Sequence, residues 1–249
     1  MLLSPYFYQM KKMALIPARY AATRFPAKLM QPLGNKTVIR HTYENTLATG
    51  LFDDVIVATD SDIIYHEITS YGGKAIMSKR EHESGSDRIA EAVEDIDVEI
   101  ILNVQGDEPF MQKEPLAKLL QVFEGEKGSS IQVASMMKLF ADVSMVEDPN
   151  NVKVVVDSNM NSLLFSRSVI PYNRAAIPVS YYHHIGVYAF RKQALMNFTK
   201  WSITPLEAAE KIECLRYLEH GIPLKMIIVD FKGVGIDTPH DLERAKQYI

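Results

Sequence analysis

The chain has 249 residues, of which 47% are hydrophobic and 23% are charged, and its formal net charge is −4. These values are typical of a globular protein and argue against a nucleic-acid-binding surface, which needs clustered positive charge. The single cysteine, Cys214, excludes an intrachain disulfide and favours a reducing compartment.

Residues 1–12 are predicted to be a short extension ahead of the first strand. Their apolar stretch precedes Lys11 and Lys12, whereas a secretory signal carries its positive charges first. No stretch approaches the ~20 consecutive apolar residues of a membrane-spanning helix. We therefore expect a cytoplasmic protein without membrane insertion.

The first half of the chain predicts alternating strands and helices. The predicted strands are 13–16, 54–59, 74–77 and 99–104, of which 54–59 and 99–104 are apolar enough to be buried on both faces. The predicted helices are 37–48, 60–71 and 86–93, the last with Ser86 as its N-cap. This order predicts an α/β fold with a doubly wound, mainly parallel sheet of Rossmann-like type. Ligands of such folds bind at the carboxyl ends of the strands.

The second half of the chain is richer in strand patterns. Strands are predicted at 151–157, 163–166, 183–190 and 224–229, with a hairpin turn at 157–161. Helices are predicted at 204–220, with Pro205 at the first position, and at 239–248. Residues 123–149 give no clear pattern. Because no linker or repeat is present, residues 13–249 are predicted to form a single domain with a β-rich insertion at about 150–185.

A cationic loop, residues 17–28, follows the first predicted strand. It places Arg19, Arg24 and Lys28 where side-chain cations and backbone N–H groups can surround phosphates. The loop lacks both the Walker pattern and the dinucleotide-binding glycine pattern, so a solvated basic loop is the alternative interpretation.

Two aspartates follow later strands. Asp107 comes after strand 99–104, beside Gly106, which allows the backbone to approach a ligand closely. Asp237 follows the last strand, although Thr238 and Pro239 also make it a plausible helix start. Because Mg²⁺ usually takes one or two protein carboxylates and completes its shell with phosphates and water, both aspartates are candidate ligands.

Other polar clusters allow two interpretations. Asp60 and Asp62 form a D-x-D triplet like that of metal-dependent glycosyltransferases, but a helix start is the favoured reading. The segment His82–Arg88, which includes Ser84 and Gly85, could bind a base or ribose, or form a helix cap with a solvated arginine.

The consecutive residues His183 and His184 face opposite ways in a predicted strand, so one is expected to face the ligand crevice. Their spacing fits no zinc site, and no nucleophile signature is present. Chemistry by positioning and electrostatics is therefore expected.

A series of motifs spans the chain in a fixed order. They are IPARY (16–20) with Arg24, Pro26 and Lys28; VATD (57–60); SGSDR (84–88); NVQGDEP (103–109); PNNVKVV (149–155); FSR (165–167) with Ile170 and Pro171; HIGVY (184–188); PLE (205–207) with Glu210, Glu213, Leu215 and Arg216; and DTP (237–239) with DLE (241–243). In these motifs the chain closely resembles the 3-deoxy-manno-octulosonate cytidylyltransferases, also called CMP-KDO synthetases, from about Met13 to Tyr248.

The resemblance implies a nucleotidyltransferase fold and transfer of CMP from CTP to 3-deoxy-D-manno-octulosonate (KDO), for lipopolysaccharide synthesis. It implies that the catalytic residues are Arg19, Lys28, Asp107 and Asp237, with Mg²⁺ at the two aspartates. The implied nucleotide-binding residues are Pro17, Ala18, Arg19, Arg24, Lys28, Ser84, Gly85, Arg88 and Asp107. The implied sugar-binding residues are Gln105, His184, Tyr188 and Glu213. The β-rich insertion is implied to form a homodimer interface.

The chain departs from the family pattern at three positions. Ala27 stands where glycine is common, Leu29 where proline often follows the lysine, and Cys214 where glutamine is usual. Because a glutamine amide can bond sugar hydroxyls that a thiol serves poorly, 8-amino-KDO or a sialic-acid-like nonulosonate stays open as the acceptor. A D-x-D glycosyltransferase and a nucleotide-binding regulator without turnover are the alternatives outside this class.

Overall fold

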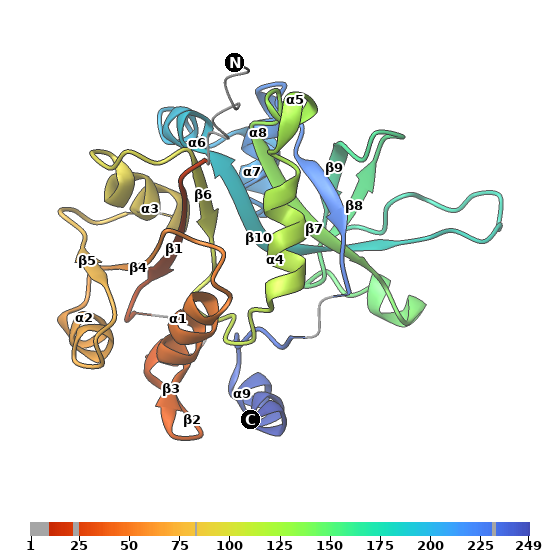
Figure 1. The fold of residues 1–249 in the computed structure, drawn as a ribbon. Coiled ribbons are helices and arrows are strands. Elements are labelled where there is room, and N and C mark those ends of the chain that lie inside the picture. The colour runs from red at the N-terminus through yellow and green to blue at the C-terminus, as the bar shows by residue number, and fades with distance from the viewer. Residues whose placement is uncertain (1–9, 22–24, 83, 231–232) are drawn as a thin grey trace, which may run out of the picture.

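One large sheet runs through the centre of the structure (Figure 1). The computed structural model describes residues 10–21, 25–82, 84–230 and 233–249. Within these ranges the sheet is built from β1 (Lys12–Ala18), β4 (Asp54–Thr59), β5 (Ala75–Met77), β6 (Ile100–Asn103), β7 (Val133–Leu139), β8 (Lys153–Val156), β9 (Ser162–Ser166), β10 (Tyr182–Arg191) and β11 (Lys225–Ile228). A small separate hairpin consists of β2 (Pro32–Leu33) and β3 (Lys36–Thr37).

The strand order is β11-β7-β10-β6-β1-β4-β5, with β8 paired to β10 and β9 paired to β8. β1 runs parallel to both β4 and β6, β4 runs parallel to β5, and β7 runs parallel to β11. β10 is antiparallel to all three of its partners, β6, β7 and β8. The parallel strands β6, β1, β4 and β5 therefore all end at one edge of the sheet.

Helices cover both faces of the sheet. They are α1 (Val38–Ala48), α2 (Asp62–Thr69), α3 (Gly85–Val93), α4 (Lys113–Gln121), α5 (Gly125–Gly128), α6 (Lys192–Phe198), α7 (Pro205–Glu210), α8 (Leu215–Glu219) and α9 (Pro239–Ala245). Single 3₁₀ turns occur at η1 (Lys28–Met30), η2 (Val143–Val146) and η3 (Lys246–Tyr248). Apolar side chains of α1, α2, α4 and α9 pack on one face, and those of α3, α6 and α8 on the other.

The two faces of β1 show why this strand is uniformly apolar. Ala14 and Ile16 join the core on the α1 side, whereas Met13 and Leu15 join the core on the α3 side. This alternation follows from the two-residue period of a strand. Helices on both faces of a sheet with parallel central strands confirm the predicted α/β fold. β1 begins at Lys12, one residue before the predicted boundary, and residues 1–9 lie outside the described residues.

Two predicted helix boundaries are wrong. The helix predicted at 204–220 is divided into α7 and α8, because Lys211 adopts a left-handed conformation with φ 53° and ψ 47°. The N-cap of α3 is Ser84 rather than Ser86, since the Ser84 hydroxyl accepts a hydrogen bond of 3.1 Å from the Asp87 N–H.

The stretch without a clear pattern, 123–149, contains a central strand. β7 lies between β10 and β11, and five of its seven residues are buried. Its polar residues, Ser135 and Lys138, interrupt the apolar pattern that would have indicated a buried strand.

The predicted β-rich insertion contains β8, β9 and the beginning of β10. The Asp157 carboxylate accepts hydrogen bonds of 2.8 Å from the N–H groups of Asn159 and Asn161, which forms the predicted hairpin turn. The loop between β9 and β10 projects away from the body of the protein (Figure 1). We call residues 150–181 the arm. Within the described part of the chain, no helix combines the length and apolarity needed to cross a bilayer.

Candidate active site

A cavity of about 210 Å³ lies at the carboxyl ends of β1 and β6. Its lining residues are Pro17, Ala18, Arg19, Lys28, Leu29, His82, Ser84, Gly85, Arg88, Gln105, Gly106 and Asp107. Every predicted nucleotide-binding residue that the structure describes is in this set. The remaining one, Arg24, lies outside the described residues.

Two glycines allow the surrounding loops to converge. A Cβ atom on Gly106 would lie 3.0 Å from the Pro17 carbonyl oxygen, and one on Gly85 would lie 3.2 Å from the Pro17 ring. Both distances are tighter than ordinary carbon contacts, so larger residues would push these segments away from β1. Gly106 was predicted to let the backbone approach a ligand closely. In the structure it lets the backbone at position 106 approach the Pro17 carbonyl group of the protein itself.

Lys28 joins the two candidate metal ligands. Its ammonium group forms an ion pair with Asp107 and a second one of 3.0 Å with Asp237 Oδ1. Burial lowers the pKa of Lys28, but the two carboxylates outweigh this and raise it above its usual value. A hydrogen bond of 2.9 Å from the Ile236 N–H to the Asp107 carbonyl holds the two acidic segments together. Asp237 therefore lies beside Asp107 at the same lysine, while Thr238 caps α9 through Asp241.

This arrangement fits a divalent cation. Among the described residues, no cluster of three or more His, Cys, Asp or Glu side chains is placed to hold a metal ion. Mg²⁺, however, needs only one or two protein carboxylates when phosphates and water supply the other ligands. Asp107 and Asp237 already converge on one cationic group, which is the geometry such a site requires.

Glu108 adds a third acidic group beside this pair. Burial and the neighbouring charges of Asp107 and Asp237 raise its pKa to about 8, so it is mostly protonated at neutral pH. A Cβ atom on Gly235 would lie only 2.7 Å from the Glu108 carboxyl oxygen, so a glycine makes room for it. Sequence reasoning assigned Glu108 no role, although it follows Asp107 directly.

The lysine-bearing turn carries a strained residue. Ala27, which precedes η1, adopts a left-handed conformation with φ 51° and ψ 32°. This conformation costs a residue with a Cβ atom roughly 1 kcal/mol and costs glycine almost nothing. The glycine common at this position in the family therefore has a backbone explanation.

We expect Ala27→Gly to raise the free energy of unfolding by about 0.5–1 kcal/mol, because relief of strain outweighs the added freedom of the unfolded chain. Urea unfolding would measure the change. Ala117→Gly, within the right-handed helix α4, is the control and should lower the free energy of unfolding by about 1 kcal/mol. An equal loss of unfolding free energy in both variants would show that Ala27 is not strained.

Arg88 is part of the cavity wall rather than a solvated side chain. Its guanidinium donates to Asp60 at 2.6 Å and to Ser78 at 2.8 Å, and the side chain is almost fully buried. Asp60 is thus an ion-pair partner of α3. Ser61 is the N-cap of α2 and Asp62 its first residue, so the D-x-D triplet starts a helix as predicted, although the Ser61 side chain forms no capping hydrogen bond.

His82 lines the cavity and belongs to the segment 82–88, for which a base or ribose site was predicted. Its side chain is only 3% exposed, and its Nε2 atom lies 3.0 Å from Glu91 Oε2. Glu91 also accepts a hydrogen bond from the Lys79 N–H. Burial raises the pKa of Glu91, but His82 and the Lys79 N–H outweigh it and lower the value.

A second cavity adjoins the first, and a third adjoins the second. The second, of about 920 Å³, shares His82, Ser84, Gly85 and Gln105 with the first and extends to Glu213. The third, of about 220 Å³, is lined by Asn150, Val152, Arg167, His183, His184, Gly186, Tyr188, Lys211, Ile212 and Glu213. The four predicted sugar-binding residues therefore line adjoining cavities, which meet at Glu213. Both histidines line the smaller one.

A bulge in β10 brings two of these residues together. The pairing with β7 shifts between Ile185 and Tyr188. In a regular strand, residues four apart are separated by about 13 Å, yet the rings of His184 and Tyr188 lie 5.4 Å apart. Ser135 of β7 stabilises the bulge, because its hydroxyl lies 3.0 Å from His184 Nε2 and 2.9 Å from the Val187 carbonyl oxygen.

The buried imidazole of His184 predicts a pH-dependent stability. Burial lowers its pKa to about 3, below the ordinary value of 6.5. Since the unfolded chain then binds more protons, stability is full above pH ~6.5 and falls by up to about 1.4 kcal/mol per pH unit below it. Urea unfolding between pH 7 and 5 should show a shallower loss for His184→Gln than for the wild type. Equal slopes would contradict a neutral His184.

Glu213 lies where the cavities meet and is held by α3. Its Oε2 atom accepts a hydrogen bond of 2.9 Å from the Ser86 hydroxyl. Its Oε1 atom is buried and has no partner among the described residues. Burial raises the pKa of this carboxyl, although Ser84 and Ser86 lower it. A hydroxyl group of a bound molecule that donated a hydrogen bond to Oε1 would satisfy this oxygen.

Cys214 lines none of the three cavities described above. It is 3% exposed and lines a separate crevice together with Glu213, Tyr188 and Tyr217. Burial raises the pKa of its thiol. The thiol therefore lies beside Tyr188 and Glu213 without reaching the larger cavities.

Comparison with known proteins shows to which family the chain belongs. A family model described as Cytidylyltransferase matches residues 13–227. The 3-deoxy-manno-octulosonate cytidylyltransferase of Flavobacterium johnsoniae is 58% identical over 238 residues, covering 95% of this chain and 98% of that protein. The protein of the same name from Christiangramia forsetii is 55% identical over 237 residues, covering 95% and 96%. The chain belongs to the 3-deoxy-manno-octulosonate cytidylyltransferase family.

A solved structure of this family supports the same fold. A CMP:2-keto-3-deoxy-manno-octonic acid synthetase complexed with CTP matches with a TM-score of 0.90 and 35% identity, covering 96% of this chain and 98% of that chain. The resemblance inferred from the motifs is thereby confirmed. The glycosyltransferase alternative finds no support among these cytidylyltransferase relatives.

Proposed function

We propose that the protein transfers CMP from CTP to KDO, producing CMP-KDO and pyrophosphate for lipopolysaccharide synthesis. The observation that carries this proposal is the convergence of Lys28, Asp107 and Asp237 beside a cavity lined by the cationic loop and α3. The adjoining cavities, which Glu213 joins, provide room for the sugar acid. Membership of the cytidylyltransferase family supplies the reaction type.

The reaction is a displacement at phosphorus. The anomeric hydroxyl oxygen of KDO forms a bond to the α-phosphorus of CTP, the bond from that phosphorus to the bridging oxygen breaks, and pyrophosphate leaves while the hydroxyl proton is released. Catalysis of such a transfer depends on alignment and charge neutralisation. Arg19 and Lys28 line the cavity and supply positive charge to the triphosphate, and Gln105 stands between the nucleotide and acceptor cavities.

Magnesium is the proposed cofactor, held by Asp107 and Asp237. When bound, it supplies charge neutralisation at the phosphates. With the metal bound, the Lys28 ammonium would no longer pair with the two carboxylates and would bind the phosphates instead. The same lysine thus neutralises the acidic pair before substrate binds and the triphosphate afterwards.

The acceptor is proposed to contact Gln105, His184, Tyr188 and Glu213. His184 stays neutral because its pKa lies near 3, so it acts as a hydrogen-bonding group rather than a cation. Cys214 lines none of the three cavities, so the cysteine in place of the usual glutamine leaves their polar lining residues in place. This favours KDO over its relatives as the acceptor.

A cytoplasmic homodimer formed through the arm completes the proposal. The arm exposes Leu163, Tyr172 and Ile177, with Tyr172 85% exposed. Apolar side chains gathered on a projecting segment are typical of a surface that another protein covers.

A pyrophosphate-release assay with CTP and Mg²⁺ tests the function. We expect release with KDO, and much weaker release with 8-amino-KDO or sialic acid. Absence of release with every sugar acid would refute the transfer, and release with sialic acid alone would reassign the acceptor.

A further inference from the structure

Glu213 lies in a turn that a buried ion pair holds in place. We propose that Glu207 and Arg216 are positioning residues for the acceptor: they fix the turn between α7 and α8 so that the Glu213 carboxylate faces the sugar acid. This inference rests on the proposed function and adds two residues that are not among its proposed acceptor contacts, although both line the large cavity beside Glu213.

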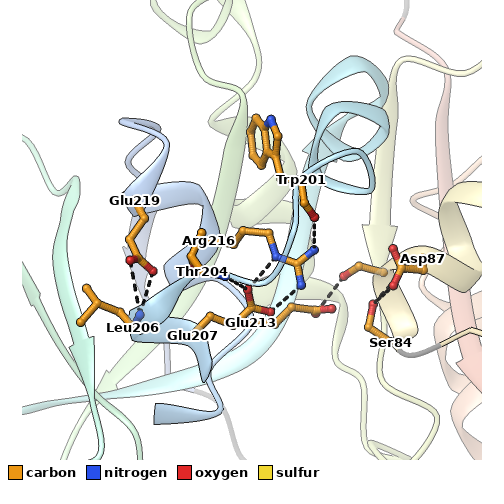
Figure 2. Close-up of polar contacts among 10 residues, drawn as sticks. Ser84, Asp87, Trp201, Thr204, Leu206, Glu207, Glu213, Arg216 and Glu219 are labelled. Atoms are coloured by element: carbon orange, nitrogen blue, oxygen red, sulfur yellow. Dashed lines mark hydrogen bonds and ion pairs between the residues drawn. The ribbon is translucent and has the colours of Figure 1, made fainter. Parts of the chain in front are cut away.

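The ion pair is two-pronged and buried. Arg216 Nε lies 2.7 Å from Glu207 Oε2, and Arg216 Nη2 lies 2.5 Å from Glu207 Oε1. The two side chains are only 7% and 9% exposed. Figure 2 shows the fork of Arg216 facing Glu207, with Glu213 next to the pair. A bidentate arrangement of this kind defines direction as well as distance.

Further contacts attach the pair to its surroundings. Arg216 Nη1 donates to the Trp201 carbonyl oxygen at 3.2 Å (Figure 2), and its guanidinium carbon lies 4.1 Å from the centre of the Phe198 ring. Glu207 Oε2 also accepts a hydrogen bond of 3.3 Å from the Thr204 N–H. One carboxylate therefore connects the beginning of α7 with α8 and, through Arg216, with the end of α6.

The turn between these helices carries Glu213. α7 ends at the left-handed residue Lys211, and the Arg216 N–H donates to the Glu213 carbonyl oxygen at 3.2 Å. Arg216 thus holds the residue three positions before it through the backbone, and holds the preceding helix through its side chain. A displacement of α8 relative to α7 would move Glu213 with it.

Glu213 needs such support because its own contacts are few. Ser86 bonds one carboxylate oxygen, and the other is buried without a partner among the described residues. The positive charge of Arg216 lowers the pKa of Glu213, which partly opposes the effect of burial. Since a buried ion pair is often no more stabilising than apolar residues of the same size, a positional role accounts better for Glu207 and Arg216.

The test compares Michaelis constants for the two substrates. Arg216→Lys keeps the charge and removes the planar fork. We expect it to raise the KM for KDO about tenfold while the KM for CTP stays within about twofold. Arg191→Lys is the matched control, because Arg191 also donates to two backbone carbonyls, of Ile131 and Gly128, and lies near a ring, that of Phe123. It should change neither KM.

Thermal unfolding checks that each variant is folded. If Arg216→Lys does not fold, Glu207→Gln, which keeps the shape and loses the charge, is judged by the same criteria. A selective rise in the KM for KDO supports the inference. A KM for KDO equal to that of the control, or an equal rise for both substrates, overturns it. An inactive wild type would instead count against the proposed function, so the two failures are distinguishable.

Discussion

Asp107→Asn is expected to lower kcat/KM for pyrophosphate release by roughly a thousandfold, equivalent to about 4 kcal/mol of transition-state stabilisation. The substitution preserves the shape of the side chain but removes a negative charge that the proposed Mg²⁺ requires. It also removes one of the two ion pairs of Lys28. Steady-state kinetics with CTP, Mg²⁺ and KDO would measure the loss, and a thermal unfolding curve would show that the fold is intact.

Asp97→Asn is the matched control for this substitution. Asp97 is exposed and pairs with Lys11, away from the three cavities. The control should retain wild-type kcat/KM. If Asp107→Asn were as active as the control, Asp107 would be excluded as a metal ligand, and the cation site proposed between Asp107 and Asp237 would have to be abandoned.

Lys28→Met is expected to have opposite effects on catalysis and on metal binding. Loss of the ammonium group should lower kcat/KM about a hundredfold, because the triphosphate loses a positioned charge. In the absence of nucleotide, however, the variant should bind Mn²⁺ about tenfold more tightly than the wild type, because the cation that neutralises Asp107 and Asp237 is gone. Electron paramagnetic resonance of free Mn²⁺ would measure the binding.

Lys36→Met separates this local effect from a general change in charge. Lys36 pairs with Glu44, so its removal alters the net charge equally without touching the acidic pair. It should leave Mn²⁺ binding unchanged. If Lys28→Met and Lys36→Met bound Mn²⁺ alike, Lys28 would not be the group that occupies the cation position.

Much of the nucleotide cavity could be predicted from the sequence because its parts follow strands. The cationic loop follows β1, and Gln105, Gly106 and Asp107 follow β6. Parallel neighbouring strands bring such loops to the same edge of the sheet. The local sequence does not show with which distant residue each side chain pairs. The ion pairs of Lys28 with Asp107 and Asp237 join residues 79 and 209 positions apart.

The acceptor side was less predictable for a different reason. The break at Lys211 and the bulge in β10 are backbone irregularities inside segments whose apolar pattern is continuous. Periodicity assumes a regular helix or strand, so it cannot locate such irregularities. Ser135 was missed for the same reason, since its role depends on a strand that the sequence left unassigned.

Arg88 and Cys214 show how burial changes the meaning of a residue type. An arginine at a helix start suggests a solvated charge, but Asp60 and Ser78 occupy its guanidinium. A thiol beside Glu213 suggests that it lines the same large cavities, but Cys214 lines only the small crevice that it shares with Glu213 and Tyr188. Sequence adjacency therefore could not show which cavity each of the two residues lines.

The bulge in β10 lies on a strand shared by two parts of the molecule. Before the bulge, Tyr182 and His183 pair with β8 of the arm, and after it residues 188–191 pair with β6 of the central sheet. His184 and Tyr188 stand on either side of this junction. If the arm forms the proposed dimer interface, β10 connects the subunit contacts directly to His184 and Tyr188, the residues proposed to contact the sugar. Arg19 and Asp107, which line the cavity proposed for CTP, follow β1 and β6 instead.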